Sequence, residues 1–351
     1  MSDQRLLIAM SGGVDSSAAA HLILTDGFSA LGATMKLTHR LPGNPDNEHD
    51  VEAAKNTCRI LGIEHHTVDL CDDFKKRVAD DFAKMYEQGK TPNPCIVCNK
   101  FIKFGALLDY ALSVGCTGIA SGHYARIERD PSGRFLLKKA ADETKDQSYM
   151  LWSLSQEQLS RAHLPLGNMT KKEVRELALS LGFGNATKKD SQDICFIPDG
   201  DYASFIERYT GRSFPVGDYT DMSGNILGKH KGIINYTVGQ RKGLGIALGE
   251  PMFVHSKNAE SNTVILCRND ELFSKSLTAT NVNLIATDSL SSPTRLLAKA
   301  RYRHTASPAT VIQTDKKTVR VEFDEPIRAI SPGQSLVLYD GDTVVGGGFI
   351  E

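Results

Sequence analysis

The chain has 351 residues, of which 40% are hydrophobic and 24% charged, a composition that excludes an intrinsically disordered or fibrous protein. At about 150 residues per domain, this length favours two or three domains. The 41 basic and 42 acidic side chains nearly cancel, so any nucleic acid must bind to a local patch rather than to a generally basic surface.

The N-terminus and the cysteines indicate a reducing compartment. The apolar run at residues 6–10 follows the acidic Asp3 and is too short for a signal peptide or a membrane span, so we expect a cytoplasmic protein without membrane segments. Seven cysteines are an odd number for a chain with no predicted export. Reduced thiols with a catalytic or metal-binding role are therefore a better interpretation than structural disulfides.

Short apolar runs alternate with helical patterns in the first part of the chain. This pattern predicts strands at 6–10, 31–37, 63–68 and 117–121, and helices at 16–24, 50–61, 74–88 and 101–114. Such alternation is typical of an α/β fold in which helices cover both faces of a parallel sheet. Ligands of such sheets bind at the carboxyl ends of the strands.

The pattern changes after about residue 200, where a short helix at 202–209 ends at Gly211 and glycine becomes frequent. Short alternating runs then predict strands at 252–255, 262–267, 296–302, 310–313, 318–323 and 335–339. We therefore divide the chain into an N-terminal domain at 1–200, a small β-rich domain at 201–270 and a second β domain, a barrel or a sandwich, at 275–351.

The strongest chemical signal lies directly after the first strand, in the segment Ser11-Gly12-Gly13-Val14-Asp15-Ser16-Ser17. Glycines let the backbone approach an anion, the amides of a helix N-terminus face it, and hydroxyl groups add donors. The segment lacks the lysine of a Walker loop and the third glycine of a dinucleotide fingerprint. We interpret it as a loop for the pyrophosphate of ATP, with Asp15 as the candidate Mg²⁺ ligand. An ordinary helix cap is the alternative.

Three cysteines form the second signal. Cys95 and Cys98 follow two prolines at a point where a helix can begin, and Cys195 lies a hundred residues further on. Helix amides lower the pKa of a thiol at such a point and favour the thiolate. Buried structural thiols, or half of a zinc site that needs two more ligands, are the alternatives.

Together these features resemble the bacterial tRNA-specific 2-thiouridylases of the MnmA type. The resemblance runs in the family's order from residue 6 to residue 335. Beside the phosphate loop and the Cys195 segment, it is carried by TPNP at 91–94, CNK at 98–100, KFG at 103–105, GHYA at 122–125, KDQSY at 145–149 and YTVGQRKGLG at 236–245.

The resemblance implies three domains: an adenine-nucleotide alpha-hydrolase-like domain with the PP-loop, a small central tRNA-binding domain and a C-terminal β-barrel. Such an enzyme replaces oxygen by sulfur at carbon 2 of the wobble uridine (position 34) of tRNA. ATP adenylates the uracil oxygen, and a partner protein delivers persulfide sulfur. By resemblance Cys98 is the nucleophile, Cys195 carries the persulfide, and the two form a disulfide when the product is released.

The resemblance also implies binding residues. Those for ATP would be Ala9, Met10, Ser11, Gly12, Gly13, Val14, Asp15, Ser16, Met35 and Gly122. Those for the tRNA anticodon stem-loop would be His123, Lys145, Asp146, Gln147, Arg301, Tyr302 and Gln334. From the residues alone, His123 could equally cap a turn, 145–147 could be a solvated charged stretch, and 301–302 could be an exposed strand.

Cys95 departs from the family, many of whose members have aspartate there. Cys95, Cys98 and Cys195 could together hold a four-iron cluster with one iron open to sulfide, or Cys95 could be a bystander. Two other functions remain open. A PP-loop ligase or amidotransferase acting on a small carboxylate would need neither the β domains nor three cysteines. A non-catalytic cluster-binding RNA module would leave the phosphate loop unexplained.

Overall fold

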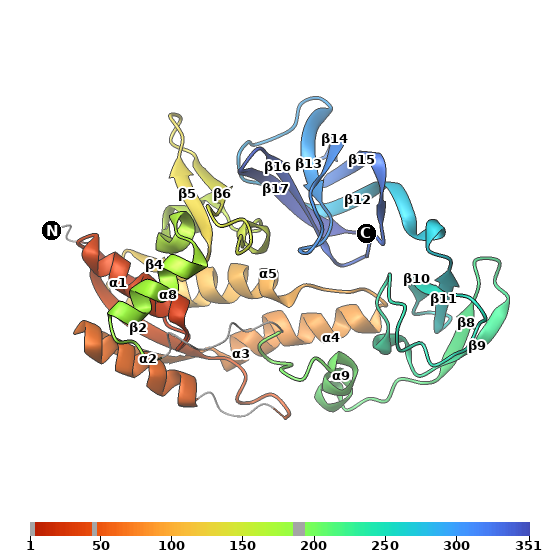
Figure 1. Cartoon of the computed structure of the whole chain (residues 1–351), viewed down its shortest axis with the longest axis horizontal. Coiled ribbons are helices and arrows are strands. Elements are labelled where there is room, and N and C mark those ends of the chain that lie inside the picture. The colour runs from red at the N-terminus through yellow and green to blue at the C-terminus, as the bar shows by residue number, and fades with distance from the viewer. Residues whose placement is uncertain (1–3, 44–47, 185–193) are drawn as a thin grey trace. The chain divides into compact units, whose positions relative to one another are not determined.

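The structure, a computed structural model, describes residues 4–43, 48–184 and 194–351 and divides into two compact units (Figure 1). Unit 1 combines Met1–Val78, Cys95–Phe196 and Asp342–Val345. Unit 2 combines Ala79–Pro94, Ile197–Gly341 and Gly346–Glu351. Within the described residues, no helix has both the length and the apolarity needed to cross a membrane.

Unit 1 is built on a five-stranded parallel sheet with the strand order β3-β2-β1-β4-β7. Its strands are β1 (Arg5–Ala9), β2 (Ser29–Lys36), β3 (Glu64–Asp69), β4 (Gly118–Ala120) and β7 (Ala162–His163). Leu7 at the centre of β1 pairs with Leu31 on one side and Ile119 on the other, and it is fully buried. A strand that has neighbours on both sides and is covered on both faces has a continuous apolar sequence, and this is why β1 could be predicted from the sequence.

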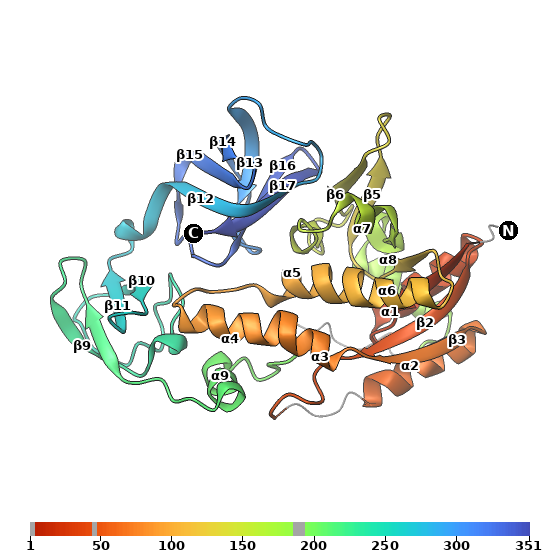
Figure 2. The same cartoon turned by 180° about the vertical axis from the view of Figure 1, so that it is seen from behind.

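Helices cover this sheet. Among them, α1 packs on β2, and α2 packs on β2 and β3 (Figures 1 and 2). Those of unit 1 are α1 (Val14–Thr25), α2 (Glu48–Leu61), α3 (Cys71–Phe74), α5 (Pro94–Cys98), the π-helical η2 (Asn99–Ala106), α6 (Leu107–Ser113), the 3₁₀ turns η3 (Ser148–Met150) and η4 (Pro165–Asn168), α7 (Gln156–Ser160) and α8 (Lys171–Ser180). Right-handed crossovers that advance in one direction place α1 and α2 on the same face. Leu6 and Ile8 of β1 pack there with Ala54 and Cys58 of α2.

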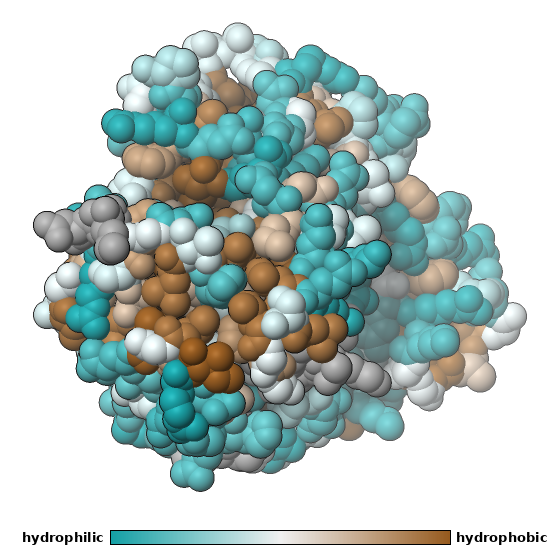
Figure 3. Space-filling model, turned by 60° about the vertical axis from the view of Figure 1, so that its left-hand side comes forward, coloured by the Kyte–Doolittle hydropathy of each residue, from teal (hydrophilic) through white to brown (hydrophobic). Residues whose placement is uncertain are grey.

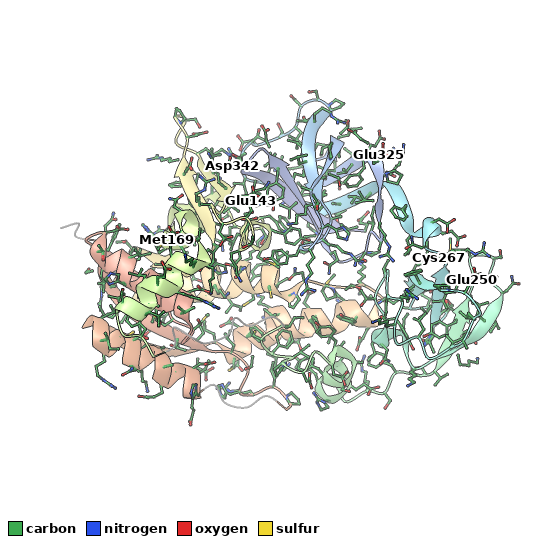
Figure 4. The ribbon with its side chains drawn as sticks, viewed as in Figure 1. Glu143, Met169, Glu250, Cys267, Glu325 and Asp342 are labelled. Carbon is green, nitrogen blue, oxygen red and sulfur yellow. The ribbon has the colours of Figure 1, made fainter. Side chains whose placement is uncertain are left out.

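A hairpin that the sequence analysis missed completes unit 1. Strands β5 (Ala125–Arg129) and β6 (Phe135–Lys139) pair antiparallel, and β6 also pairs with Thr343 and Val344 at the start of β17 (Thr343–Ile350). Arg126 donates to the carboxylate of Asp342 at 2.6 Å; Asp342 is labelled in Figure 4. The hairpin is short and carries charges on both faces, so it lacks the apolar alternation that marks a strand.

Unit 2 contains a four-stranded sheet and a closed six-stranded barrel. The sheet has the order β10-β11-β8-β9, with β8 (Gly217–Thr220), β9 (Ile226–His230), β10 (Phe253–Asn258) and β11 (Thr263–Cys267). The barrel has the order β12-β15-β14-β13-β16-β17 and closes by the pairing of β12 with β17. Its other strands are β12 (Phe273–Leu284), β13 (Thr294–Lys299), β14 (Ser307–Asp315), β15 (Thr318–Arg328) and β16 (Ser335–Asp340).

Short helices accompany these sheets. They are η1 (Lys75–Ala79), which ends at the start of unit 2, α4 (Asp80–Glu87), α9 (Tyr202–Thr210), η5 (Ile233–Asn235) and η6 (Asp270–Leu272). The predicted end of α9 at Gly211 is confirmed, because Gly211 has a φ of 67°, the left-handed conformation in which glycine commonly terminates a helix.

Most predicted strands and helices are confirmed, but the strand expected at 296–302 is wrong at its end. β13 stops at Lys299, and a turn follows in which His304 N–H donates to the carbonyl of Arg301 at 3.1 Å. Arg301 and Tyr302 therefore lie in a turn. Strands β8, β9, β12 and β17 were also not predicted, because their polar or glycine-rich sequences hide the alternation of a strand.

Apolar residues gather on the face where the N-terminal part of the chain comes forward (Figure 3). Unit 1 also has a hollow of about 340 Å³ beside the edge strand β7 and the β5–β6 hairpin. Its lining combines apolar side chains, such as Ile23, Phe28 and Leu159, with the charged side chains of Asp26, Glu128 and Arg129. None of the predicted binding or catalytic residues lines this hollow.

Candidate phosphate loop and thiol site

The phosphate loop connects β1 to α1 at the carboxyl edge of the sheet. Gly12 has a φ of 68°, and a Cβ there would lie 2.6 Å from the carbonyl oxygen of Asp50, so only glycine fits. The Ser11 N–H donates to the Ser16 hydroxyl at 3.2 Å, and the Ser16 hydroxyl donates to the carbonyl of Gly13 at 3.0 Å. These bonds fold the loop back over the first turn of the helix.

The first turn of α1 suits an anion. Its N-cap is Gly13, which has no side chain to accept from the amides of that turn. The carboxylate of Asp15 accepts hydrogen bonds from Tyr124 and Lys171 and does not cap the helix. The alternative interpretation of this segment as an ordinary helix cap is therefore not supported. A twelve-residue helix whose first amides are not capped by a side chain is a favourable place for phosphate.

The strand order places the other predicted nucleotide residues on both sides of this loop. β1 lies between β2, which carries Met35, and β4, which is followed by Gly122. The order reverses between β1 and β4, and such switch points are where open α/β sheets bind ligands. A polar hollow of about 610 Å³ lies beside the ends of β2 and β3 and the start of α2, lined by Lys36, Glu48, His49, Val51, Glu52, Lys55 and Thr67.

Gly122 packs directly on the phosphate loop. A Cβ at Gly122 would lie 2.7 Å from the carbonyl carbon of Asp15 and 2.9 Å from the amide nitrogen of Ser16. Such contacts are shorter than any side chain tolerates. The turn after β4 therefore packs against the backbone of the phosphate loop, and this close packing requires glycine at position 122.

The contacts of Asp15 do not fit its predicted role as a magnesium ligand. Its Oδ1 accepts from Lys171 Nζ at 2.8 Å and from the Tyr124 hydroxyl at 2.7 Å, and its Oδ2 accepts from Lys171 Nζ at 2.8 Å. Both oxygens are thus bound to donors, one of them a cation, and we derive no step through a magnesium ion at Asp15. Tyr124 entered the sequence analysis only as part of GHYA at 122–125, and Lys171 did not enter it. Neither bond to Asp15 was predictable, because the two residues lie 109 and 156 positions from it.

The structure brings the three predicted thiols together in unit 1. The charges of Cys195 and Cys95 both raise the pKa of Cys98, and the charge of Cys95 raises the pKa of Cys195. Because such charge interactions act between neighbouring groups, the three thiols lie close together. The ammonium group of Lys103 lowers the pKa of all three. Cys95 and Cys195 reach solvent, whereas Cys98 is buried. Among the described residues, which include all seven cysteines, no disulfide is present.

The predicted low thiol pKa is wrong for these cysteines. Cys95 and Cys195 are exposed as whole residues, but the protein around all three thiol groups displaces water from them. This loss of solvation raises the pKa of Cys98 to about 12 and that of Cys195 to about 11, and it also raises the pKa of Cys95. Cys98 is the last residue of α5, a full turn beyond the helix start, so the loss of water outweighs the helix amides. The thiols of Cys98 and Cys195 are therefore protonated at neutral pH in this structure.

A π-helical turn follows Cys98 directly and carries Lys103. Segment η2 spans Asn99–Ala106 within an otherwise continuous helix, and such wide turns are frequent at functional sites. The side-chain amide of Gln158 donates to the carbonyls of Lys100 at 2.8 Å and Phe104 at 2.7 Å, which holds the turn open. The Gln158 side chain also completes the capping box of α7. No local sequence signal marks this arrangement.

His123 joins the two parts of the site. It is only 9% exposed, its Nδ1 lies 2.7 Å from the Ser121 hydroxyl, and its ring centroid lies 6.0 Å from that of Phe104 on η2. Burial and then Lys103 lower the pKa of His123 well below its usual value, so the ring is neutral. These contacts favour the turn-supporting interpretation over a direct contact with tRNA.

The predicted RNA-binding segment 145–147 is largely bonded within unit 1. The carboxylate of Asp146 accepts from the Ala140 N–H at 3.0 Å and the Ser148 hydroxyl at 2.8 Å. Gln147 accepts from the Tyr124 N–H at 2.9 Å and donates its own N–H to the Tyr124 carbonyl at 2.8 Å. Of the three residues, Lys145 is the one whose side chain is suited to reach a phosphate.

The remaining predicted tRNA residues belong to unit 2, where two of them hold turns. Arg301 donates to the carbonyl of Val238 at 2.8 Å and to the hydroxyl of Ser331. Gln334 donates to the carbonyl of Thr91 at 2.8 Å. Tyr302 is half-buried with Lys299 Nζ 5.5 Å from its ring centroid. Arg301 and Gln334 thus have structural contacts that the sequence did not reveal.

A further polar cluster lies at the ends of β2 and β3, where Cys71 Sγ is 3.0 Å from His39 Nδ1. Asp69 completes a trio whose ligand atoms lie within 4.8 Å of one another. Arg40 already pairs with Asp69 at 2.7 Å, and Cys71 donates to the carbonyl of Lys36 at 3.4 Å. These bonds satisfy the trio as a local network, and we assign no metal to it.

Comparisons with known proteins cover the whole chain. The family model described as "tRNA methyl transferase HUP domain" matches residues 4–199, the "tRNA methyl transferase PRC-barrel domain" matches 203–268, and the "Aminomethyltransferase beta-barrel domain" matches 274–350. A solved 4-thiouridine synthetase in complex with RNA and ATP is 20% identical over 56% of this chain and 46% of its own, with a TM-score of 0.36, too low to support an argument.

Curated relatives are much more similar. The tRNA-specific 2-thiouridylase MnmA of Clostridioides difficile is 47% identical over 99% of this chain and 98% of its own. That of Acetivibrio thermocellus is 47% identical over the full length of both chains, and that of Lachnoclostridium phytofermentans is 45% identical over 99% of each. With this identity over nearly every residue, the chain belongs to the family of tRNA-specific 2-thiouridylases MnmA.

Proposed function

We propose that this protein catalyses the ATP-dependent 2-thiolation of the wobble uridine of tRNA. The observation that carries the proposal is that unit 1 contains both a phosphate loop and a group of three thiols. The turn at 121–123 links them, because Gly122 packs on the loop and the His123 ring lies 6.0 Å from that of Phe104, which follows Cys98 on η2. A ligase acting on a small carboxylate explains the loop but not the thiols. Methyl transfer, the activity in two of the domain descriptions, requires neither an ATP loop nor a persulfide carrier.

The phosphate loop supports the first step, transfer of AMP to the uracil oxygen. The loop amides and hydroxyl groups at 11–16 would bind the phosphates, with Gly122 packed against the loop on the β4 side. The nucleoside would lie beside Met35 near the end of β2, toward the polar hollow next to α2. The uracil oxygen attacks the α-phosphorus and pyrophosphate leaves. The oxygen is then part of a good leaving group, because AMP is far more stable than oxide.

The thiols support the second step, in which sulfur replaces oxygen. A sulfur-relay protein would load Cys195, which reaches solvent, as a persulfide. The terminal sulfur attacks carbon 2 and AMP departs with the oxygen, which leaves the uridine joined to Cys195 through two sulfurs. The thiolate of Cys98 then attacks the Cys195 sulfur, the thiocarbonyl leaves, and a Cys98–Cys195 disulfide remains for a thiol reductant to reopen.

Lys103 suits this chemistry because it lowers the pKa of each thiol, against the effect of burial. Lys145 in unit 1 and Tyr302 in unit 2 are our candidates for contacts with the anticodon stem-loop, through phosphate pairing and base stacking. We retain the division into domains at 1–200, 201–270 and 275–351, and we place the enzyme in the cytoplasm with its ATP and tRNA substrates.

The proposal is tested by incubating the purified protein with ATP, unmodified tRNA transcripts and a persulfide donor. We expect 2-thiouridine at position 34 and one pyrophosphate released per thiolation, with little release in the absence of tRNA. A transcript with cytidine at the wobble position is the matched control. Pyrophosphate release driven by a small carboxylate instead of tRNA would support the ligase function and refute ours.

The three thiols also match the donor set of a four-iron cluster with one iron open, which Cys95, Cys98 and Cys195 would hold. When bound, such a cluster would supply an iron that carries sulfide. We propose the persulfide route because Cys195 is an exposed residue, whereas Cys98 is buried, so a donor protein can approach Cys195. Cys95→Asp should then leave thiolation by aerobically purified, iron-free enzyme within about twofold of wild type.

The measurement is thiolated tRNA per enzyme, with iron quantified in the same samples for wild type and Cys95→Asp. Carboxylate is a harder and poorer ligand for an iron–sulfur cluster than thiolate, so a cluster enzyme would lose iron and activity together. Activity that follows iron content in the wild-type protein would refute the persulfide route.

A further inference from the structure

The bonds of Asp15 define a cluster in which two buried residues contact the phosphate loop. It is here called the Asp15 cluster and consists of Asp15 of the loop with the buried Tyr124 and Lys171. Lys171 Nζ contacts both carboxylate oxygens at 2.8 Å, and the Tyr124 hydroxyl donates to one of them at 2.7 Å. The Lys171 side chain is only 10% exposed and that of Asp15 is 34% exposed. A buried lysine is almost always paired, and here its partner is the one acidic residue in the loop.

The fold fixes Lys171 independently of Asp15. Lys171 is the first residue of α8, directly after the turn at Met169 and Thr170; Met169 is labelled in Figure 4. The helix begins with a capping box between Thr170 and Glu173, and the Asp142 carboxylate accepts from the Lys171 N–H at 3.0 Å. The ammonium also lies 5.8 Å from the ring centroid of Tyr124. The charge is therefore held in place before any ligand binds.

We propose that Lys171 is a positioning residue for the phosphate loop and acts through Asp15, with Tyr124 as the second donor. The loop contains no lysine of its own, unlike a Walker loop. Without Lys171, the Asp15 carboxylate would face the polyphosphate of ATP as an uncompensated negative charge. Lys171 neutralises that charge and holds the first turn of α1 in the position where its amides face the phosphates.

Tyr124 connects this cluster to the KDQSY segment. Its backbone forms two hydrogen bonds with Gln147, while its hydroxyl reaches Asp15. The inference rests on the ATP-binding half of the proposed function and does not require that tRNA be the substrate. Its test therefore uses ATP binding by the protein alone.

The experiment measures the ATP affinity of the full-length protein by calorimetry for wild type, Lys171→Met, Lys171→Arg, Asp15→Asn and the double variant Lys171→Met/Asp15→Asn. We expect Lys171→Met to weaken ATP binding at least tenfold, because Asp15 loses its cation. Lys171→Arg should stay within about threefold, since a guanidinium group pairs with both carboxylate oxygens. The double variant should bind ATP more tightly than Lys171→Met, because the uncompensated carboxylate is gone.

Lys172→Met is the matched control, since the Lys172 side chain is 85% exposed and pairs with Glu176 at 3.7 Å across the surface of the same helix. It should bind ATP as wild type does. If the fold-losses of ATP affinity in Lys171→Met and Asp15→Asn multiply in the double variant, the two residues act independently, and this result would overturn the inference. So would an unchanged affinity of Lys171→Met. If the affinity pattern holds while tRNA is not thiolated, the inference stands and the proposed function fails.

Discussion

Replacing Cys195 by serine should lower tRNA thiolation at least a thousandfold, because a hydroxyl group cannot carry a persulfide sulfur. The side chain has the same shape, and Cys195 is exposed, so the change removes chemistry without leaving a cavity. ATP affinity and tRNA affinity should remain within about twofold of wild type. The measurement is 2-thiouridine formed per enzyme, together with both affinities on the same preparation.

The matched control is Cys116→Ser, which makes the same change at a buried thiol of unit 1. It should reduce the melting temperature slightly, because a buried hydroxyl needs a hydrogen-bond partner, but it should retain thiolation. If Cys195→Ser thiolates tRNA at the wild-type rate, Cys195 is structural and the sulfur must reach the uridine by another route.

The second large effect is expected for Gly122→Ala. The added methyl group would lie 2.7 Å from the carbonyl carbon of Asp15 and 2.9 Å from both the Asp15 carbonyl oxygen and the Ser16 nitrogen. All three are backbone atoms, so the phosphate loop itself must move. Because a displacement of about 1 Å at a reacting group can cost a hundredfold in rate, we expect pyrophosphate release to fall by roughly that factor.

The control for this change is Gly184→Ala, where a Cβ would meet no atom within 4 Å. It should leave both pyrophosphate release and melting temperature unchanged. Gly122→Ala should lower ATP affinity while the protein remains folded, as judged by circular dichroism. Wild-type ATP affinity in Gly122→Ala would show that the turn after β4 does not support the loop.

The central sheet and the phosphate loop were predictable because their signals are local. Continuous apolar runs mark buried parallel strands, and a glycine–serine segment between a strand and a helix marks an anion site. The thiols were also predictable as a group, since only Cys95, Cys98 and Cys195 lie in motif segments. Their grouping in unit 1 agrees with that expectation.

The missed parts of the site depend on contacts between distant segments. Nothing near Lys171 in the sequence shows that its ammonium reaches Asp15, 156 residues away. The pKa of Cys98 was predicted in the wrong direction because position in a helix is readable from sequence and burial is not. Arg301 looked available for RNA because its bonds to Val238 and Ser331 form only when unit 2 is folded.

The division of β17 has a consequence for synthesis on the ribosome. Thr343 and Val344 pair with β6 in unit 1, and the residues from Gly346 onward close the barrel of unit 2. Translation proceeds from the N-terminus, so the partner of β6 emerges only after nearly the whole polypeptide has been made. Until then the outer edge of β6 has no neighbour from the C-terminal strand. A fragment that ends near residue 200 would keep this edge exposed permanently, so such fragments should be more prone to aggregate than the whole enzyme.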